Sequence, residues 1–70
     1  MAYGQVLKAA RRQKGISQEE LAALVGVDRT YPSLLERAER SPTLVIIINV
    51  ALALELRPGK MIDDVAERLA

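Results

Sequence analysis

One stretch, residues 17–37, constrains the fold more than any other part of the chain, because it specifies two short helices and the turn between them. It reads SQEELAALVGVDRTYPSLLER. Ser17 and Glu20 have the spacing of a capping box, in which the serine oxygen accepts a free backbone N–H and the glutamate reaches back to the cap. Apolar residues recur at helical spacing up to Gly26, which favours the left-handed conformation that closes a helix. Asp28 is suited to cap the next helix, so the stretch predicts a helix-turn-helix.

Helical patterns on both sides of this stretch account for nearly all of the remaining residues. Gly15 is placed to end a first helix, Thr43 to cap a fourth, and Pro58 to occupy the first position of a fifth. No strand pattern and no internal repeat interrupts these segments. The sequence therefore predicts an all-α fold with the helix-turn-helix formed by the second and third of five helices. Their expected ranges are 3–14, 18–25, 29–37, 44–54 and 58 onward.

The composition excludes several kinds of site. The 70 residues form a single domain, residues 1–70, and contain no cysteine and no histidine, so disulfides and the common nitrogen and sulfur ligands of metals are absent. No pair of carboxylates is expected in a pocket, since Asp63 and Asp64 are adjacent and cannot share a helix face. The sequence thus predicts neither an enzyme nor a site for a metal, a cofactor or a small-molecule ligand.

The net charge of +1 indicates no polyanionic partner by itself, but the charges are unevenly distributed. Seven basic and five acidic residues lie up to Arg40, whereas three basic and four acidic residues follow it. Any anion-binding face is therefore expected in the first half of the chain. The longest apolar run, residues 44–48, is far too short to span a bilayer, and the N-terminus lacks the pattern of a signal peptide. We therefore expect a cytoplasmic protein with no membrane partner.

The helix expected over residues 44–54 has almost no polar face. It reads LVIIINVALAL, and only Asn49 interrupts the apolar side chains. A helix without a wet face is buried on two sides, and in so small a domain the second side must be another subunit. Residues 44–70 are therefore expected to contribute to dimerisation, with Asn49 setting the register against its twofold counterpart. The expected interface consists of Val45, Ile46, Asn49, Leu52, Ala53, Leu56, Val65 and Leu69.

Four segments occur in this order along the chain: R-x-x-K-G-I-S-Q-E-E-L-A, G-V, L-x-E-R and S-P. With this combination, the chain resembles the Xre/Cro/phage-repressor family of helix-turn-helix DNA-binding domains over about residues 3–62. Its length and fifth helix are similar to those of restriction-modification controller proteins, a subgroup of the family. The resemblance implies a five-helix, nucleoid-associated transcriptional regulator that binds double-stranded DNA as a homodimer on a palindromic operator.

The resemblance also implies which residues contact DNA. Gln18 matches a glutamine that touches a backbone phosphate and supports the recognition helix. Ser17 beside it lies at a helix N-terminus, where free N–H groups favour phosphate. Arg29 has the chemistry to bind guanine O6 and N7. Thr30 is suited to form a hydrogen bond with a base or to place its methyl group against thymine. The other matching residues are exposed positions of the third helix or backbone contacts. The full expected set is Ser17, Gln18, Arg29, Thr30, Tyr31, Ser33, Leu34, Arg37 and Arg40.

Arg11 and Glu36 match a pair that forms a salt bridge between the first and third helices in many relatives, and Lys14 is a further candidate for a phosphate contact. Plainer interpretations stand beside the DNA-binding ones. Capping alone explains Ser17, and Gln18 suits a solvated position in the first turn of a helix. Lys14 and Arg40 are also consistent with surface cations that contact only water.

Two residues depart from the family pattern around the third helix. Pro32 falls where relatives carry an inward Val or Ile, and with Asp28 as the cap it is the fourth helical residue. The helix is then expected to start late, to be kinked or to open with a tighter turn. Ala38 replaces the usual glycine after the helix, which costs ~1 kcal/mol if that residue is left-handed. The alternative function is therefore a degenerate helix-turn-helix that serves as a protein-interaction or dimerisation module.

Overall fold

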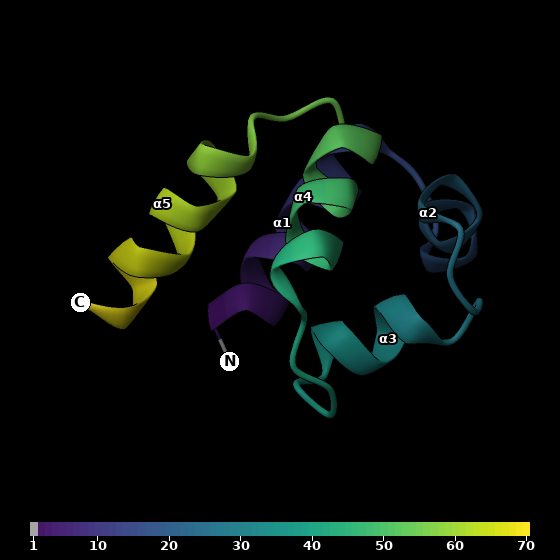
Figure 1. The fold of residues 1–70 in the computed structure, drawn as a ribbon, viewed down its shortest axis with the longest axis horizontal. Helices are drawn as coiled ribbons and strands as arrows, with labels where there is room; N and C mark the ends of the chain where they lie inside the picture. Colours follow the sequence, from purple (N-terminus) through teal and green to yellow (C-terminus); the bar gives the residue numbers. More distant parts are fainter. Residues whose placement is uncertain (1) are drawn as a thin grey trace.

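The computed structural model describes residues 2–70, which form five α-helices in the predicted order (Figure 1). No strand occurs within this range, so the predicted all-α fold class is confirmed. Four of the helices have nearly the bounds expected from the sequence, and the third is shorter at both ends. The helices are α1 (Ala2–Lys14), α2 (Gln18–Val25), α3 (Tyr31–Glu36), α4 (Leu44–Ala53) and α5 (Pro58–Leu69).

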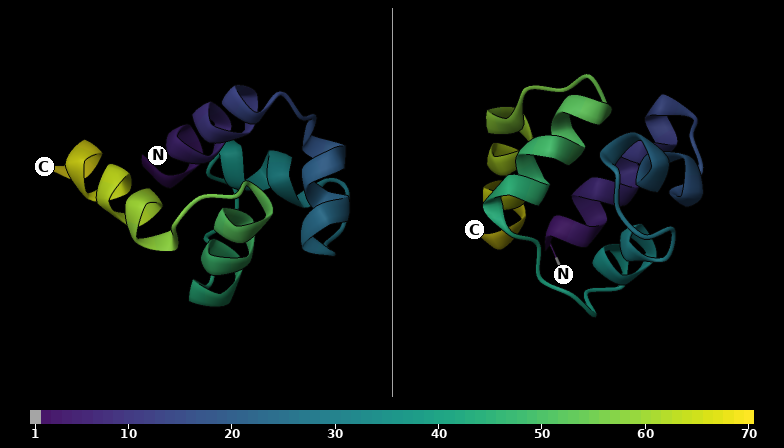
Figure 2. Two further views of the ribbon diagram at one scale, coloured as in Figure 1. Left: turned by 90° about the horizontal axis from the view of Figure 1, so that it is seen from above. Right: turned by 45° about the vertical axis from the view of Figure 1, so that its right-hand side comes forward.

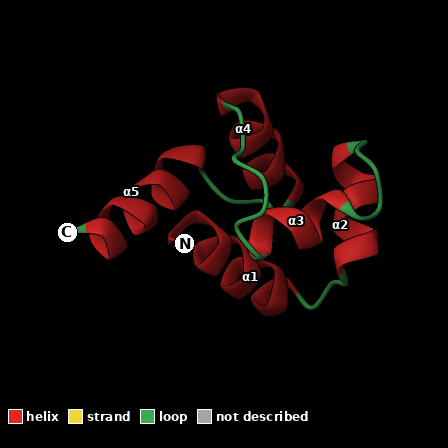
Figure 3. Cartoon of the chain, turned by 90° about the horizontal axis from the view of Figure 1, so that it is seen from below, coloured by secondary structure: helices red, strands yellow, loops and turns green. Residues whose placement is uncertain are grey.

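The α2–α3 pair and the last helix lie at opposite ends of the molecule, with α1 and α4 between them (Figures 1 and 3). α1 packs against both α3 and α5, and α4 packs against both α2 and α5. The two views of Figure 2 show the same separation of α2 from α5. The helix-turn-helix therefore lies at one end of the molecule, supported from one side by α1 and α4.

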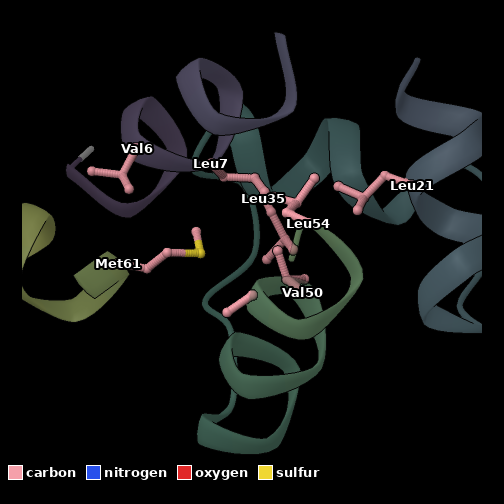
Figure 4. Packing of buried hydrophobic residues seen from close by; sticks show 8 residues of the cluster. Val6, Leu7, Leu21, Leu35, Val50, Leu54 and Met61 are labelled. Atoms are coloured by element: carbon pink, nitrogen blue, oxygen red, sulfur yellow. The ribbon is translucent and has the colours of Figure 1, made fainter. Parts of the chain in front are cut away.

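Aliphatic side chains from all five helices form one core. Leu7 of α1, Leu21 of α2 and Met61 of α5 are almost completely buried. In Figure 4, Leu7 and Leu35 meet near the centre, while Leu21 enters from the α2 side and Met61 from the α5 side. Because each helix contributes at least one buried side chain, the two ends of the molecule are joined through a continuous apolar interior. The cluster comprises Val6, Leu7, Leu21, Leu35, Val50, Ala51, Leu54 and Met61.

Left-handed residues close the first four helices. Gly15 and Gly26 follow α1 and α2 with φ angles of 80° and 83°, as the sequence predicted. Ala38 and Glu55 lie two residues after the ends of α3 and α4 and have the same left-handed conformation, with φ angles of 60° and 59°. A Cβ atom crowds the backbone in this conformation, so these two helix ends are strained in a way that the glycine ends are not.

Replacing Ala38 by glycine is expected to raise the free energy of unfolding by about 1 kcal/mol, because the strain of the left-handed alanine disappears. The Ala38 N–H donates to the Leu35 carbonyl at 3.1 Å, and the Glu39 N–H donates to the Leu34 carbonyl at 2.8 Å, so the helix end itself is well formed. Urea denaturation followed by circular dichroism measures the change. Gly26→Ala is the matched reverse substitution and is expected to lower the free energy of unfolding by a similar amount. An Ala38→Gly variant with the same free energy of unfolding as the wild-type protein would show that Ala38 is not strained.

α4 buries only one side of its apolar surface within the chain. Val50 and Ala51 are buried, whereas Leu44, Val45 and Leu52 are each more than 60% exposed. Of the residues expected at a dimer interface, Val45, Asn49, Leu52 and Leu69 are exposed, and Ile46, Ala53, Leu56 and Val65 are half-buried against the core. A substantial apolar surface on the second half of the chain therefore has no cover from residues 2–70. No helix in this range has the length and apolar character needed to cross a membrane.

Candidate nucleic-acid interface

A shallow groove of about 290 Å³ lies between the start of α2 and the start of α3. Its lining is polar and charged, and four of its residues belong to α2 or the turn that precedes α3. Five of the six lining residues are among those that the sequence predicted to contact DNA; the sixth, Glu19, is not. The groove is lined by Gln18, Glu19, Arg29, Thr30, Ser33 and Arg37.

The start of α2 is fixed by the predicted capping box. The Ser17 hydroxyl oxygen accepts the Glu20 N–H at 3.0 Å, and the Ser17 N–H donates to the Glu20 carboxylate at 2.9 Å. Gly26 then closes the helix, and its N–H donates to the Ala22 carbonyl at 2.8 Å. These local contacts hold one wall of the groove in place, and they use the Ser17 oxygen as an acceptor.

A buried carboxylate joins α1, α2 and α3 behind the groove. Glu36, whose side chain is 4% exposed, forms an ion pair with Arg11 at 2.7 Å. The same carboxylate accepts a hydrogen bond from the Gln18 amide at 3.1 Å. Arg11 also donates to the Ile16 carbonyl at 2.9 Å, and its hydrogen bond with Glu36 raises the pKa of the Arg11 guanidinium. Gln18 is thus held by the protein and is not merely a solvated first-turn residue.

α3 starts later than the sequence predicted. Asp28 is not its cap: the N-cap is Thr30, and no side chain caps that end. Instead, the Asp28 carboxylate accepts hydrogen bonds from the backbone N–H and the hydroxyl of Thr30, and the Asp28 carbonyl accepts the Tyr31 N–H at 2.9 Å. Asp28 forms its hydrogen bonds in a turn that competes with helix initiation. Arg29 and Thr30 therefore project from this turn, where the sequence had placed them in the helix.

The late start explains how α3 accommodates Pro32. The proline is the second helical residue and not the fourth, so the N–H that it lacks would have had no partner within the helix. The first regular hydrogen bond of the helix joins the Leu34 N–H to the Thr30 carbonyl at 3.2 Å. Pro32 is also buried, which matches the inward position expected from the resemblance. Of the three outcomes expected for this proline, the late start is the one observed.

The remaining predicted residues do not line the groove. Tyr31 and Leu34 are half-buried, and Ser17 belongs to the cap at the start of α2. Arg40 is exposed and lines a separate pocket of about 180 Å³. Tyr3 lines the same pocket, and its burial, with a smaller contribution from Tyr31, raises the pKa of Tyr3 to about 12. Two of the expected cations have acidic neighbours. Arg37 pairs with Glu39 at 3.2 Å, and Lys14 pairs with Glu55.

A model of the helix-turn-helix family matches residues 7–61 of the chain, which include the groove and the core around it. The chain belongs to this family. It is of the Xre/Cro type that the sequence resembled, and its relatives are named as transcriptional regulators and control proteins and not as enzymes. Among residues 2–70, no group of three or more acidic side chains is placed to hold a metal ion.

This helix-turn-helix regulator is similar to a protein named as a transcriptional regulator and to two named as control or controller proteins. It is 46% identical over 57 residues to the uncharacterized HTH-type transcriptional regulator y4dJ of Sinorhizobium fredii, covering 81% of this chain and 74% of the relative. It is 33% identical over 64 residues to control protein C.MunI of a Mycoplasma species, covering 90% and 86%. The crystal structure of the restriction-modification controller protein C.AhdI from Aeromonas hydrophila matches with a TM-score of 0.82 and 43% identity, covering 86% and 91%.

Two features of this helix-turn-helix regulator were not predicted from its sequence. Glu19 lines the groove, and its position directly after Gln18 in the first turn of α2 was the available signal. Gly4 lies in α1 where a Cβ atom would come within 2.7 Å of the Leu35 and Glu36 carbonyl oxygens. No local pattern marks such a glycine, since the atoms that it approaches belong to a distant helix.

Proposed function

We propose that this regulator binds DNA sequence-specifically as a homodimer, reading a palindromic operator with α3 and the turn that precedes it. The observation that carries the proposal is the groove between α2 and α3, in which Arg29, Thr30 and Ser33 lie together at one end of the molecule. Arg29 is exposed and forms no ion pair with any residue from 2 to 70. A free guanidinium beside small hydroxyl side chains suits the base edges and phosphates of a major groove.

The proposed contacts divide into two kinds. Arg29 and Thr30 are assigned to base edges, since both project from the turn into the groove. Phosphate and sugar contacts, which position the protein without reading sequence, are assigned to the surrounding residues. Tyr31 and Leu34 sit at the edge of this surface, because each is half-buried. The assigned phosphate and edge contacts are Ser17, Gln18, Tyr31, Ser33, Leu34, Arg37 and Arg40.

Selection of bound sequences from a random DNA pool tests binding, specificity and symmetry together. The expected result is a palindrome whose half-sites are about one helical turn apart, ~34 Å, as two identical helix-turn-helix units require. A competition assay at physiological salt then compares the selected operator with unrelated duplexes. Equal affinity for every duplex would refute specific recognition. It would favour the alternative of a degenerate helix-turn-helix that serves as a protein-interaction or dimerisation module.

Replacing Arg29 by alanine is expected to relax the operator preference at one base position, with a loss of about tenfold in affinity for the selected operator. Arg40→Ala is the matched control, since both arginines are exposed. The Arg40 variant is expected to bind all sequences more weakly and to lower the salt slope of binding by about one. Fluorescence anisotropy over a salt series measures both quantities. Uniform weakening by the Arg29 substitution would assign that residue to phosphate instead.

The proposed dimer forms through the uncovered apolar surface of α4 and α5. Val45, Asn49 and Leu52 are separated by four and three residues, so they lie along one side of α4. On α5, Ile62 and Leu69 are 44% and 74% exposed. An apolar surface of this extent on a small chain is typical of a protein–protein interface, and a second copy is the occupant that a palindromic operator requires. The half-buried Ile46, Ala53, Leu56 and Val65 would lie at its margin.

Replacing Leu52 by aspartate is expected to convert the dimer to monomer, because the substitution places a charge inside a desolvated apolar interface. Leu24→Asp is a close control: both leucines are 61% exposed, but Leu24 lies on α2, away from the proposed interface. Multi-angle light scattering measures the mass of each variant. A Leu52→Asp variant that remains dimeric, or a wild-type protein that is monomeric at all concentrations, would place the interface elsewhere or remove it.

A further inference from the structure

The hydroxyl of Thr30 is hydrogen-bonded before any DNA arrives. Its Oγ1 lies 2.5 Å from Oδ1 of Asp28, and the Thr30 backbone N–H donates to the same carboxylate oxygen at 2.8 Å. Both residues are exposed, and Thr30 lines the groove beside Arg29. Any base that meets Thr30 therefore meets a hydroxyl whose orientation is already set by its neighbour.

The direction of this hydrogen bond follows from the chemistry of the two groups. An ionised carboxylate can only accept, whereas a threonine hydroxyl has one proton to donate and two lone pairs that accept. The hydroxyl must therefore donate its single proton to Asp28. The same hydrogen bond, together with the Thr30 N–H, lowers the pKa of Asp28, so the carboxylate stays ionised and remains an acceptor at neutral pH.

We propose that Thr30 reads an amino-bearing base, cytosine or adenine, because its single proton is already donated and its hydroxyl can only accept a hydrogen bond from a base. This inference rests on the proposed DNA binding. In the major groove, cytosine N4 and adenine N6 carry N–H donors, while guanine presents only the acceptors N7 and O6. A threonine with a free proton would accept or donate and would not make this distinction. Asp28 is thus a positioning residue that acts on specificity through Thr30.

The first test uses the operator that the wild-type protein selects from a random DNA pool. Thr30→Val, which keeps the shape but removes the hydroxyl, identifies the base position that Thr30 reads. At that position, purine replaces adenine or 2-pyrimidinone replaces cytosine, so that only the amino group is lost. The wild-type protein is expected to bind the modified operator about five- to tenfold more weakly, the contribution of one hydrogen bond. The Thr30→Val protein is expected to bind both operators alike. Guanine or thymine at that position, or equal wild-type affinity for both operators, would overturn the inference.

The second test removes the acceptor and leaves Thr30 in place. Asp28→Ala frees the hydroxyl proton, so discrimination against guanine at the Thr30 position is expected to fall from about tenfold to less than about threefold. Asp28→Asn keeps an acceptor oxygen and is expected to retain the preference, which separates the hydrogen bond from the charge. Circular dichroism verifies that each variant is folded. Full discrimination by folded Asp28→Ala would refute the role of Asp28.

The outcomes also separate this inference from the proposed function. If the wild-type protein selects no sequence at all, sequence-specific binding fails and the assignment of Thr30 falls with it. If a palindrome is selected but the amino group makes no difference, the regulator still reads DNA, and only the polarity assigned to Thr30 is wrong.

Discussion

Replacing Gly4 by alanine is expected to lower the free energy of unfolding by about 2 kcal/mol, and the melting temperature by roughly 10 °C for a domain of this size. A Cβ atom at Gly4 would lie 2.7 Å from the carbonyl oxygens of both Leu35 and Glu36. These are backbone atoms, which cannot rotate away as a side chain would. α1 would have to withdraw from the end of α3, and the packing between the two helices would be lost with it. The expected loss outweighs the ~1 kcal/mol by which alanine favours a helix over glycine.

Gly59 supplies the matched control, because it also lies in a helix but no atom beyond its chain neighbours and its own helix backbone lies within 4 Å of the position of its Cβ. Gly59→Ala is expected to leave stability unchanged or to raise it by up to about 1 kcal/mol, since alanine restricts the unfolded chain. Thermal and urea denaturation followed by circular dichroism compare the two variants with the wild-type protein. If both substitutions shift stability in the same direction, the close approach of α1 to α3 is not the cause.

The features that the sequence predicted well are those encoded by neighbouring residues. The capping box of Ser17 and Glu20 and the left-handed Gly15 and Gly26 are local, and α1 and α2 accordingly end where the pattern indicated. Gly4 could not be found in this way. Its requirement arises from carbonyl groups about thirty residues away in α3, and only the packed structure brings them together.

The error at the start of α3 came from two local structures that the same residues can form. Asp28 is equally suited to cap a helix and to accept hydrogen bonds from the residue two positions along, so the identity of this residue alone favours neither structure. Pro32 decides between the helix cap and the turn, because proline is best tolerated in the first turn of a helix. Placing Pro32 in the second position makes Thr30 the cap and leaves Asp28 in the turn, as observed.

The residues of the candidate site were predicted through the resemblance and not through periodicity. Periodicity gives the exposed side of a short helix only roughly, and α3 has just six residues. The family pattern placed Gln18, Arg29 and Ser33 on one surface, and these three line the groove. It indicated that Gln18 supports the third helix, but it did not name Glu36 as the partner, since that contact depends on how α2 and α3 pack.

Replacing Glu36 by leucine is expected to lower the free energy of unfolding by about 3 kcal/mol, the lower end of the range for breaking a buried ion pair from one side. The Arg11 side chain is only 11% exposed, so its charge would be left without a counterion away from water. Its hydrogen bond to the Ile16 carbonyl would remain, which limits the loss. Glu39→Leu is the matched control: Glu39 pairs with Arg37 at the surface, where both side chains are more than half exposed, and a change within about 0.5 kcal/mol is expected.

A double-mutant cycle with Arg11→Met separates the ion pair from the shape of the interface. Arg11→Met alone is expected to cost about 3 kcal/mol, since it leaves the buried Glu36 carboxylate unpaired, whereas Arg11→Met with Glu36→Leu is expected to cost about 1 kcal/mol, because apolar side chains of similar volume fill the site. Urea denaturation measures all four proteins, and a double variant as unstable as the sum of the single losses would contradict a direct interaction. Operator binding then gives a second measurement. The double variant folds but no longer anchors the Gln18 amide, so its affinity for the operator should fall even where its stability is recovered.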